Sequence, residues 1–188
     1  YEDENKIEIL DKIELKAKPN FENSLIDLNN AFTNKYYQIV VKENYTLKKP
    51  LIIYHATNKN LKLKNINLRL DFLLKKNSCL KLIDISNDLS EKNFINTIYN
   101  FDLSKDSILK NYKIDQQINS NIKYSFNNIE QDINSVSETF ILSSGSSFIK
   151  NEINCNLNGK FASAFINGIF SLNEKRHHEI RTSINHLI

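Results

Sequence analysis

The stretch that decides the fold reads Leu68-Arg-Leu70-Asp-Phe72-Leu-Leu74-Lys-Lys-Asn-Ser78-Cys-Leu80. Apolar residues alternate with charged ones from Leu68 to Phe72, and a period of two puts their side chains on one face of a strand. A polar segment follows, in which Asn77 tolerates a positive φ and Ser78 is small enough for a corner. The stretch therefore predicts a strand, a sharp corner and the start of the next strand.

The same corner recurs along the chain. The common form is Leu, then two polar residues, then one of Asn, Asp or Gly, then Ser, any residue and an apolar residue. This form returns in residues 103–109 and again in residues 142–148, at intervals of 29 and 39 residues. Residues 157–162 are a degraded fourth copy. Short strands joined by repeated corners are typical of a coiled sheet whose turns stack on one another. A β-sandwich would also show alternation, but it would not require the repeated corner, so we predict a mainly β protein with a β-helix.

The N-terminal part has a different pattern. Residues 1–18 fit a helix and a strand equally well. After Pro19, apolar residues at helical spacing predict an amphipathic helix with Asn20 as its N-cap: Phe21, Leu25, Leu28 and Phe32. Residues 37–41 and 51–54 are β-branched and short, and Leu61 and Leu63 begin the next alternating run. We therefore predict an N-terminal segment at 1–34 with one helix, and a β-helix core at 35–188.

Composition excludes several classes of function. The chain has 188 residues, enough for one sizeable core, and a net charge of +3 from 25 basic and 22 acidic residues. Nucleic-acid binding normally requires a clustered basic face, which so balanced a charge does not indicate. No apolar run approaches the ~20 residues of a membrane helix, and no secretory leader is visible.

The absence of Met indicates a partial or trimmed sequence. The two cysteines lie far apart and form no CxxC, which indicates a reducing compartment.

The densest polar cluster lies in residues 176–186, which hold three of the four histidines. His and Glu are common zinc ligands. On a strand, however, His177 and His178 face opposite ways, and only His177 and Glu179 share a face. The spacing also matches no zinc motif. We therefore predict polar side chains on a solvated or interface strand, and no metal site.

Other candidates for chemistry are isolated. Cys155 shares a strand face with Ile153 and Leu157, which predicts a small core residue. Cys79 has lysines at 75, 76 and 81 nearby and is the better placed of the two thiols for reactivity. His55 follows a strand and is interpreted as structural. No phosphate-binding, dinucleotide-binding, serine-hydrolase or zinc-protease motif occurs, so no catalytic residue is predicted.

Two blocks together resemble a known family. Residues 25–32 (LIDLNNAF) and 39–52 (IVVKENYTLKKPLI) resemble the "LN-x-A … I-x-V-x-x-x … L-x-x-P-I" opening of the SufB/SufD family of iron–sulfur cluster assembly proteins. Residues 157–172 (LNGKFASAFINGIFSL) and 175–186 (KRHHEIRTSINH) are similar to that family's "L-x-G-x-x-A-x-x-x-x-G-[IL]-x-x-L … K-Q-H-x-D-x-x-T-x-x-x-H". Arg176 replaces the usual Gln and Glu179 the usual Asp, which indicates a divergent member.

The resemblance implies a right-handed parallel β-helix preceded by a short α-helical segment. It also implies a non-catalytic scaffold that pairs with SufB and the ATPase SufC in a complex that builds Fe–S clusters, with no cofactor in this stretch. The lack of a SufB-type central insert favours the SufD branch. The expected location is the cytoplasm, or the stroma of a plastid or apicoplast. The residues that match the family's last block are the interface candidates: His177, Glu179, Thr182 and His186.

The family's helical region that docks SufC, and a Cys/His segment near the SufB–SufD interface, lie beyond that block and are not carried over. With the block at the end of this chain, we expect an open strand edge near Thr182 to His186 and a homodimer in isolation. Three alternatives stay open: a SufB-like paralogue, an exported β-helix enzyme acting on polysaccharides, and a plain structural rod.

Overall fold

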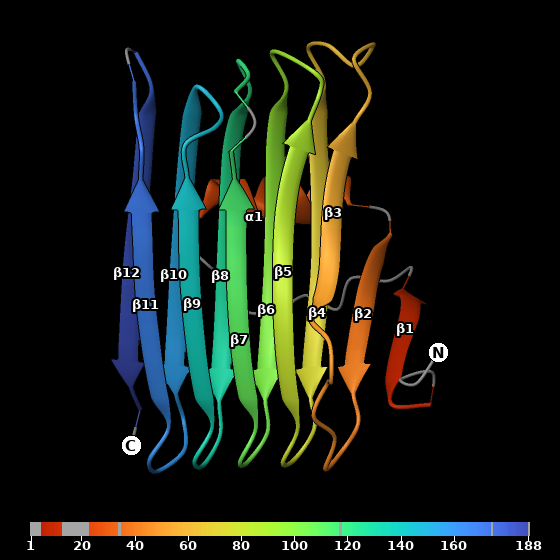
Figure 1. Cartoon of the computed structure of the whole chain (residues 1–188), viewed down its shortest axis with the longest axis vertical. Coiled ribbons are helices and arrows are strands. Elements are labelled where there is room, and N and C mark those ends of the chain that lie inside the picture. The colour runs from red at the N-terminus through yellow and green to blue at the C-terminus, as the bar shows by residue number, and fades with distance from the viewer. Residues whose placement is uncertain (1–4, 13–22, 34, 117, 174, 188) are drawn as a thin grey trace.

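The chain forms a β-solenoid of about five turns, built from two facing sheets (Figure 1). The structure is a computed structural model and describes residues 5–12, 23–33, 35–116, 118–173 and 175–187. The seven-stranded sheet has the order β1-β2-β4-β6-β8-β10-β12, and the five-stranded sheet the order β11-β9-β7-β5-β3. The elements are β1 (Ile7–Lys12), α1 (Ser24–Phe32), β2 (Tyr36–Val41), β3 (Leu51–Thr57), β4 (Asn65–Leu74), β5 (Cys79–Asp88), β6 (Phe94–Leu103), β7 (Ile108–Asp115), β8 (Ile122–Gln131), β9 (Val136–Ser143), β10 (Phe148–Leu157), β11 (Ser163–Phe170) and β12 (His177–His186).

Strand direction distinguishes this solenoid from a sandwich. Each strand pairs in parallel with the strand two elements further along the chain, as β4 does with β6 and β5 with β7. The chain therefore alternates between the two sheets, and each turn stacks on the one before it. Among the strands in the described residues, only β1 is antiparallel, running against β2. The prediction of a β-helix is confirmed, and the β-sandwich alternative is wrong.

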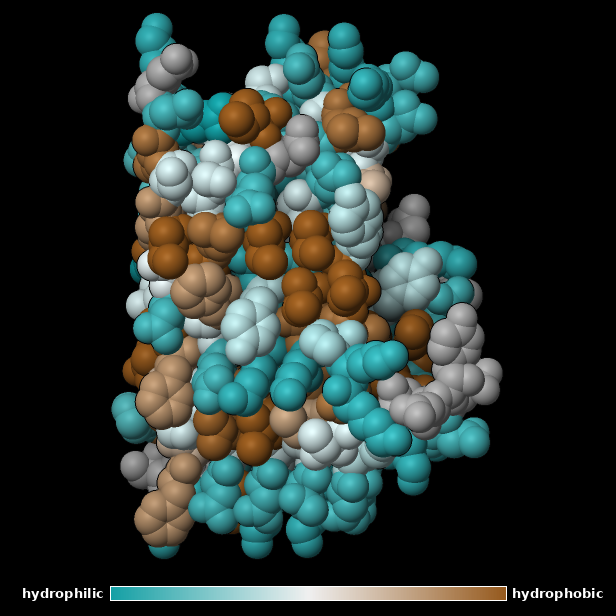
Figure 2. All heavy atoms as spheres, viewed as in Figure 1, coloured by the Kyte–Doolittle hydropathy of each residue, from teal (hydrophilic) through white to brown (hydrophobic). Residues whose placement is uncertain are grey.

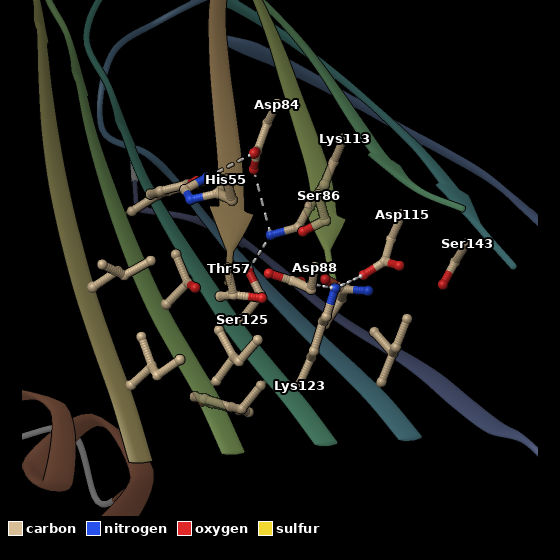
Figure 3. Close-up of a pocket in the computed structure, with 18 of the residues that line it drawn as sticks. His55, Thr57, Asp84, Ser86, Asp88, Lys113, Asp115, Lys123, Ser125 and Ser143 are labelled. Atoms are coloured by element: carbon tan, nitrogen blue, oxygen red, sulfur yellow. Dashed lines mark hydrogen bonds and ion pairs between the residues drawn. The ribbon is translucent and has the colours of Figure 1, made fainter. Parts of the chain in front are cut away.

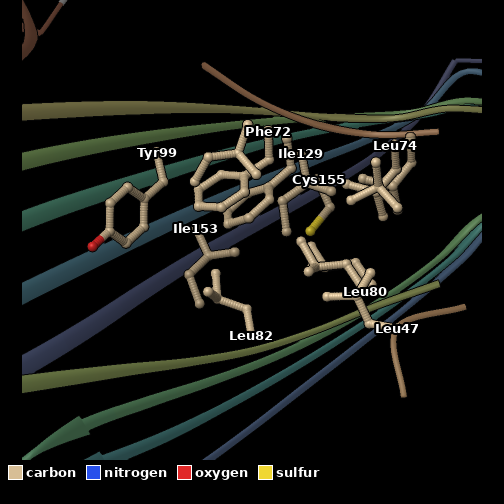
Figure 4. Close-up of a cluster of buried hydrophobic side chains, with 14 of the residues drawn as sticks. Leu47, Phe72, Leu74, Leu80, Leu82, Tyr99, Ile129, Ile153 and Cys155 are labelled. Atoms are coloured by element: carbon tan, nitrogen blue, oxygen red, sulfur yellow. The ribbon is translucent and has the colours of Figure 1, made fainter. Parts of the chain in front are cut away.

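The lower half of the solenoid in Figure 1 is filled by an apolar core, shown in Figure 4. Because the strands are in register, like residues stack: Phe72 lies opposite Phe101 in the ladder, with ring centroids 4.7 Å apart and planes 14° from parallel. Leucines from the facing sheet, including Leu80 and Leu82, complete it. Each such buried side chain contributes roughly 1.5–3 kcal/mol to stability. Cys155 is fully buried among them, so its prediction as a core residue is confirmed.

Sharp corners close the solenoid at its apolar end. Asn77, Asp106 and Asn134 have φ values of 54°, 60° and 56°, a left-handed conformation that Asn and Asp tolerate better than other non-glycine residues. The following serine locks each corner, because its hydroxyl donates to the carbonyl three residues back, as Ser107 does to Ser104 at 2.6 Å. The corners also bond to one another: the Asn134 side-chain amide donates to Asp106 at 3.0 Å.

The repeat found in the sequence was only partly the structural one. Residues 74–80 and 103–109 are equivalent corners, and the true third copy is the β8–β9 corner around Asn134. Residues 142–148 lie at the opposite end of the solenoid, where β9 leads into β10, and none of them has a positive φ. The degraded copy at 157–162 is a corner whose left-handed residue is Phe161. The corner therefore recurs after 29, 28 and 27 residues, at 77, 106, 134 and 161.

The helix exists, but with a different start and a different buried face. It begins at Ser24, and its N-cap is Asn23, whose side chain accepts a hydrogen bond from the Leu25 amide at 3.0 Å. The predicted cap, Asn20, and the predicted stripe residue Phe21 lie outside the described residues. Phe32 was predicted to be buried and is 62% exposed. Of the predicted stripe, Phe32 lies outside the buried surface, whereas Leu25 packs against a buried cluster that joins the helix to the sheet: Ile26, Ile98, Tyr124 and Phe126.

Helix α1 packs on the outer face of the seven-stranded sheet through the apolar cluster around Ile26 and through side-chain amides; it lies behind that sheet in Figure 1. Its buried residues are Ile26 and Asn29. The Asn29 side-chain amide donates to the carbonyls of Leu68 and Asn96 at 3.1 and 2.9 Å, and Asn96 returns a bond to the Leu25 carbonyl. These amide hydrogen bonds to the sheet backbone add to the apolar contacts of Ile26, and hydrophobic periodicity does not reveal them.

The remaining segments near the N-terminus complete the comparison. The ambiguous segment 1–18 contributes strand β1, while residues 1–4 and 13–18 lie outside the described part. Residues 37–41 and 51–54 fall within β2 and β3 as predicted. Leu61 and Leu63 do not belong to a strand: they lie in the β3–β4 connection, where Leu63 is 79% exposed with φ 55°.

Candidate functional site

The four residues predicted as interface candidates lie on β12, which forms the last strand of the seven-stranded sheet. His177 and Glu179 share its outer face, as the alternation predicts, whereas Thr182 and His186 face the interior side. His177 stacks on Phe148, with ring centroids 5.2 Å apart, and Glu179 lies 3.9 Å from the Lys150 ammonium group. The structure therefore places the four on one strand but does not bring them together as a single site.

The histidine cluster separates as well. The ring of His178 points inward, with Nδ1 2.9 Å from the Ser143 hydroxyl and Nε2 2.8 Å from the Ser146 carbonyl oxygen. His177 faces outward, so the two rings cannot bind one ion. Among the described residues, no group of three or more His, Cys, Asp or Glu side chains is arranged to hold a metal ion.

Neither thiol has the environment of a reactive cysteine. Burial raises the pKa of Cys155 to about 11, and its thiol lies in the apolar core. Burial also raises the pKa of Cys79, although Lys81 and Lys110 act in the opposite direction. A raised pKa reduces the thiolate fraction at neutral pH, and the thiolate is the nucleophile. The local lysines therefore do not activate Cys79.

The upper half of the solenoid encloses a cavity of about 420 Å³ between the two sheets. Figure 3 shows charged and hydroxyl side chains that point into it from neighbouring strands of both sheets. Inward-facing positions on β3, β5 and β7 carry His55, Asp84 and Lys113, in place of the apolar residues found lower on the same strands. The interior is thus divided into an apolar half and a polar half.

Two groups of ion pairs occupy this polar half. In the first, His55 Nε2 lies 2.9 Å from Asp84 Oδ1 and 2.7 Å from the Tyr99 hydroxyl, and the Lys113 ammonium is 3.8 Å from Asp84 Oδ2. In the second, the Lys123 ammonium contacts Asp88 at 2.5 Å and Asp115 at 2.7 Å. Buried charges are costly unless they are paired and hydrogen-bonded, and these pairings explain how the interior accommodates them.

The first group shifts the ionisation of its members. Burial acts to raise the pKa of Asp84, but the hydrogen bond from His55 and the charge of Lys113 outweigh it, so the pKa lies below its ordinary 3.8. Burial lowers the pKa of Lys113, against the opposing effect of Asp84 and Asp115. Burial, together with Asp84, raises the pKa of Tyr99 well above its ordinary value. A lowered Asp84 pKa stabilises the fold at neutral pH, a contribution lost as the pH falls through the folded-state pKa.

Sequence reasoning missed this site. It interpreted His55 as structural and did not single out Asp84, Asp88, Asp115, Lys113 or Lys123. A signal was available: Asp84 follows Leu80 and Leu82 at the inward parity of its strand, and Lys113 and Asp115 follow Leu109 and Asn111 at theirs. A charged side chain at an inward position is unfavourable unless an opposite charge pairs with it. Those opposite charges are identified only once the register of the strands is known.

Comparison with known families gives one match. The family model described as "SUF system FeS cluster assembly, SufBD core domain" matches residues 54–188. The match begins within β3 and runs through β12, so it includes every strand around the polar cavity and the strand that carries the four interface candidates. A comparison with curated proteins found no match. Within the described part of the chain, no helix is long and apolar enough to cross a membrane.

Proposed function

Because the chain belongs to the SufBD core domain family of the SUF system for FeS cluster assembly, we propose that it is a non-catalytic, SufD-like scaffold subunit that pairs with SufB and SufC. The observation that carries the proposal is the family match across residues 54–188. In this proposal the chain holds no cofactor of its own, and the clusters are the product of the complex. It works in the cytoplasm or a plastid stroma.

The mechanical properties of the solenoid suit a scaffold. Each strand from β6 to β10 pairs with two neighbours over eight to ten residues in register, and the apolar core is continuous along the stack. Such a stack resists bending because each turn is hydrogen-bonded to the next along whole strands. Partners attached to different turns would therefore be held at fixed positions.

The proposed contact to a partner is the outer edge of β12. This strand pairs with β10 on one side and is the end of its sheet on the other. The amides of His177 and Leu187 donate to carbonyls of Ser147 and Leu157, on the β10 side. Successive amides of a strand point to opposite edges, so the even-numbered residues, including Thr182, direct their N–H groups to the open edge. A strand of a related solenoid could pair there by β-augmentation.

We propose SufB as the natural occupant of this edge, and a second copy of the chain when SufB is absent. On the outer face of the five-stranded sheet, the face seen in Figure 2, Phe165 and Ile169 on β11 are 54% and 53% exposed, and Ile184 on β12 is 44% exposed. A partner that pairs with β12 and extends over β11 would cover these apolar side chains. Burial of exposed apolar side chains of this size favours association.

Proline substitutions on neighbouring residues test the proposed edge. In Thr182→Pro, the lost N–H is one directed at the open edge, so we expect the free energy of unfolding to change little and self-association to weaken at least tenfold. In the matched control Ser183→Pro, the lost N–H points at β10, so we expect clear destabilisation. Sedimentation velocity over a concentration series, together with thermal unfolding, measures both properties.

A wild-type chain that stays monomeric at high concentration, or a folded Thr182→Pro variant that associates as strongly as wild type, would contradict pairing through this edge.

A further inference from the structure

The polar cavity contains hydrogen-bonding capacity that its own ion pairs do not use. Asp115 uses Oδ2 to contact Lys123, while its Oδ1 is buried without a hydrogen-bond partner among the described residues. Asn151 Oδ1, on the facing sheet, is in the same condition. The two residues are 7% and 2% exposed, and both line the cavity. Buried polar atoms are almost always paired, so two unpaired acceptors around one cavity indicate a missing donor.

The charges around the cavity select the sign of that donor. Three carboxylates, Asp84, Asp88 and Asp115, line it together with two lysines and His55. Both ammonium groups already contact carboxylates, Lys113 at 3.8 Å and Lys123 at 2.5 and 2.7 Å. An anion entering here would compete with these carboxylates for the same two lysines. A cation would instead find acceptor oxygens that nothing else occupies.

Beside these charges and several hydroxyl side chains, much of the lining is aliphatic. Ile66, Leu68 and Ile95 on the seven-stranded sheet, and Ile141 on the five-stranded sheet, contribute to it. A fully hydrated inorganic ion would gain nothing from such walls, whereas a short alkyl chain would be removed from water by them. The volume of about 420 Å³ lies in the range of small-molecule pockets. The side chains of His55 and Lys113 are 18% and 15% exposed, which marks where the cavity approaches solvent.

From this arrangement we propose that the cavity binds a small aliphatic ammonium compound. The ammonium group donates to Asp115 Oδ1 or Asn151 Oδ1, and the alkyl chain lies against the isoleucine and leucine side chains. This site is separate from the β12 edge, so it stands or falls independently of the proposed partners.

Isothermal titration calorimetry of the whole 188-residue chain tests the proposal, with n-butylammonium as the probe. We expect saturable one-to-one binding that is at least tenfold tighter than binding of butyrate or n-butanol, which match its chain length but not its charge. Added salt should weaken n-butylammonium binding less than it weakens binding to exposed surface charges, because the charged groups of the cavity are largely buried.

Two asparagines provide a matched pair of variants. Asn151→Ala removes an unpaired acceptor that lines the cavity, and we expect n-butylammonium binding to weaken at least fivefold. Asn127→Ala removes an equally buried, equally unpaired acceptor that does not line the cavity, and binding should stay within twofold of wild type. Circular dichroism verifies that both variants are folded, and Asp115→Asn replaces Asn151→Ala if that variant does not fold.

Three results would overturn the proposal. One is the absence of saturable n-butylammonium binding to the wild-type chain, which would mean that water alone fills the cavity. Another is butyrate binding as tightly as the amine. The third is an Asn127→Ala variant that loses as much affinity as Asn151→Ala.

Discussion

Replacing Lys123 with Met is expected to lower the free energy of unfolding by about 3–5 kcal/mol, because the change leaves two buried carboxylates without their counter-charge. Lys123 contacts Asp88 at 2.5 Å and Asp115 at 2.7 Å, and all three side chains are less than a tenth exposed. Methionine has a similar volume, so the loss reflects charge and not a cavity. Urea unfolding followed by circular dichroism gives the free energy directly.

Lys110→Met is the matched control for this variant. Lys110 lies on β7, like the buried Lys113, but it faces outward and pairs with Glu138 at 3.1 Å on the surface. Exposed ion pairs contribute little to stability, so the control should unfold at nearly the wild-type urea concentration. If Lys123→Met and Lys110→Met unfolded at the same urea concentration, the buried ion pairs would not stabilise the polar half of the interior.

Phe101→Ala should cost about 3–5 kcal/mol, the range for removing a large aromatic side chain from a packed core. Phe101 is fully buried, stacks on Phe72 at 4.7 Å and meets Tyr99 edge-on at 6.1 Å. Its removal opens a cavity in the middle of the stack, and the rigid ladders on either side limit relaxation. The measurement is again the urea midpoint, with the slope of the unfolding transition compared between variants.

Phe32→Ala serves as the comparison, since this phenylalanine ends α1 and is 62% exposed. We expect a shift of under about 1 kcal/mol, as for most surface substitutions. A Phe101→Ala variant no less stable than Phe32→Ala would contradict the account of a continuous apolar core.

The solenoid could be predicted because its corners have local chemical requirements. Asn77 and Asp106 were recognised as residues that tolerate a positive φ, and the serine after each as a small corner residue. The third copy was assigned to Gly145 because glycine also satisfies that rule in principle. The real corner at Asn134 lacks the leading leucine, since Gln131 takes its place and satisfies its amide with the Ser163 carbonyl. Exchange of an apolar core residue for a hydrogen-bonded one hid the true period.

The polar docking contacts of the helix and the cavity could not be predicted for a common reason. In both, polar residues occupy buried positions and find their partners far along the chain: Asn29 with Asn96, and Lys123 with Asp88. Hydrophobic periodicity treats buried positions as apolar, so it does not single out Asn29 on α1 and gives no reason to group the cavity residues. Only the register between strands brings such partners together.

For the last strand, the sequence predicted correctly that His177 and Glu179 share a face and that His177 and His178 do not. The same alternation puts Thr182 and His186 on the opposite face, but the sequence could not predict which strand pairs with this one and which of its edges stays open. The role of these four residues stays a prediction, which the proline variants test.

We propose that this chain holds SUF proteins in place and leaves the chemistry to them. The most direct test is co-expression of the tagged chain with SufB and SufC from the same source, followed by affinity purification and native mass spectrometry. The account predicts a stable complex that contains all three chains, from which Thr182→Pro is lost. Recovery of the wild-type chain without SufB and SufC, under conditions in which those two proteins bind each other, would contradict it.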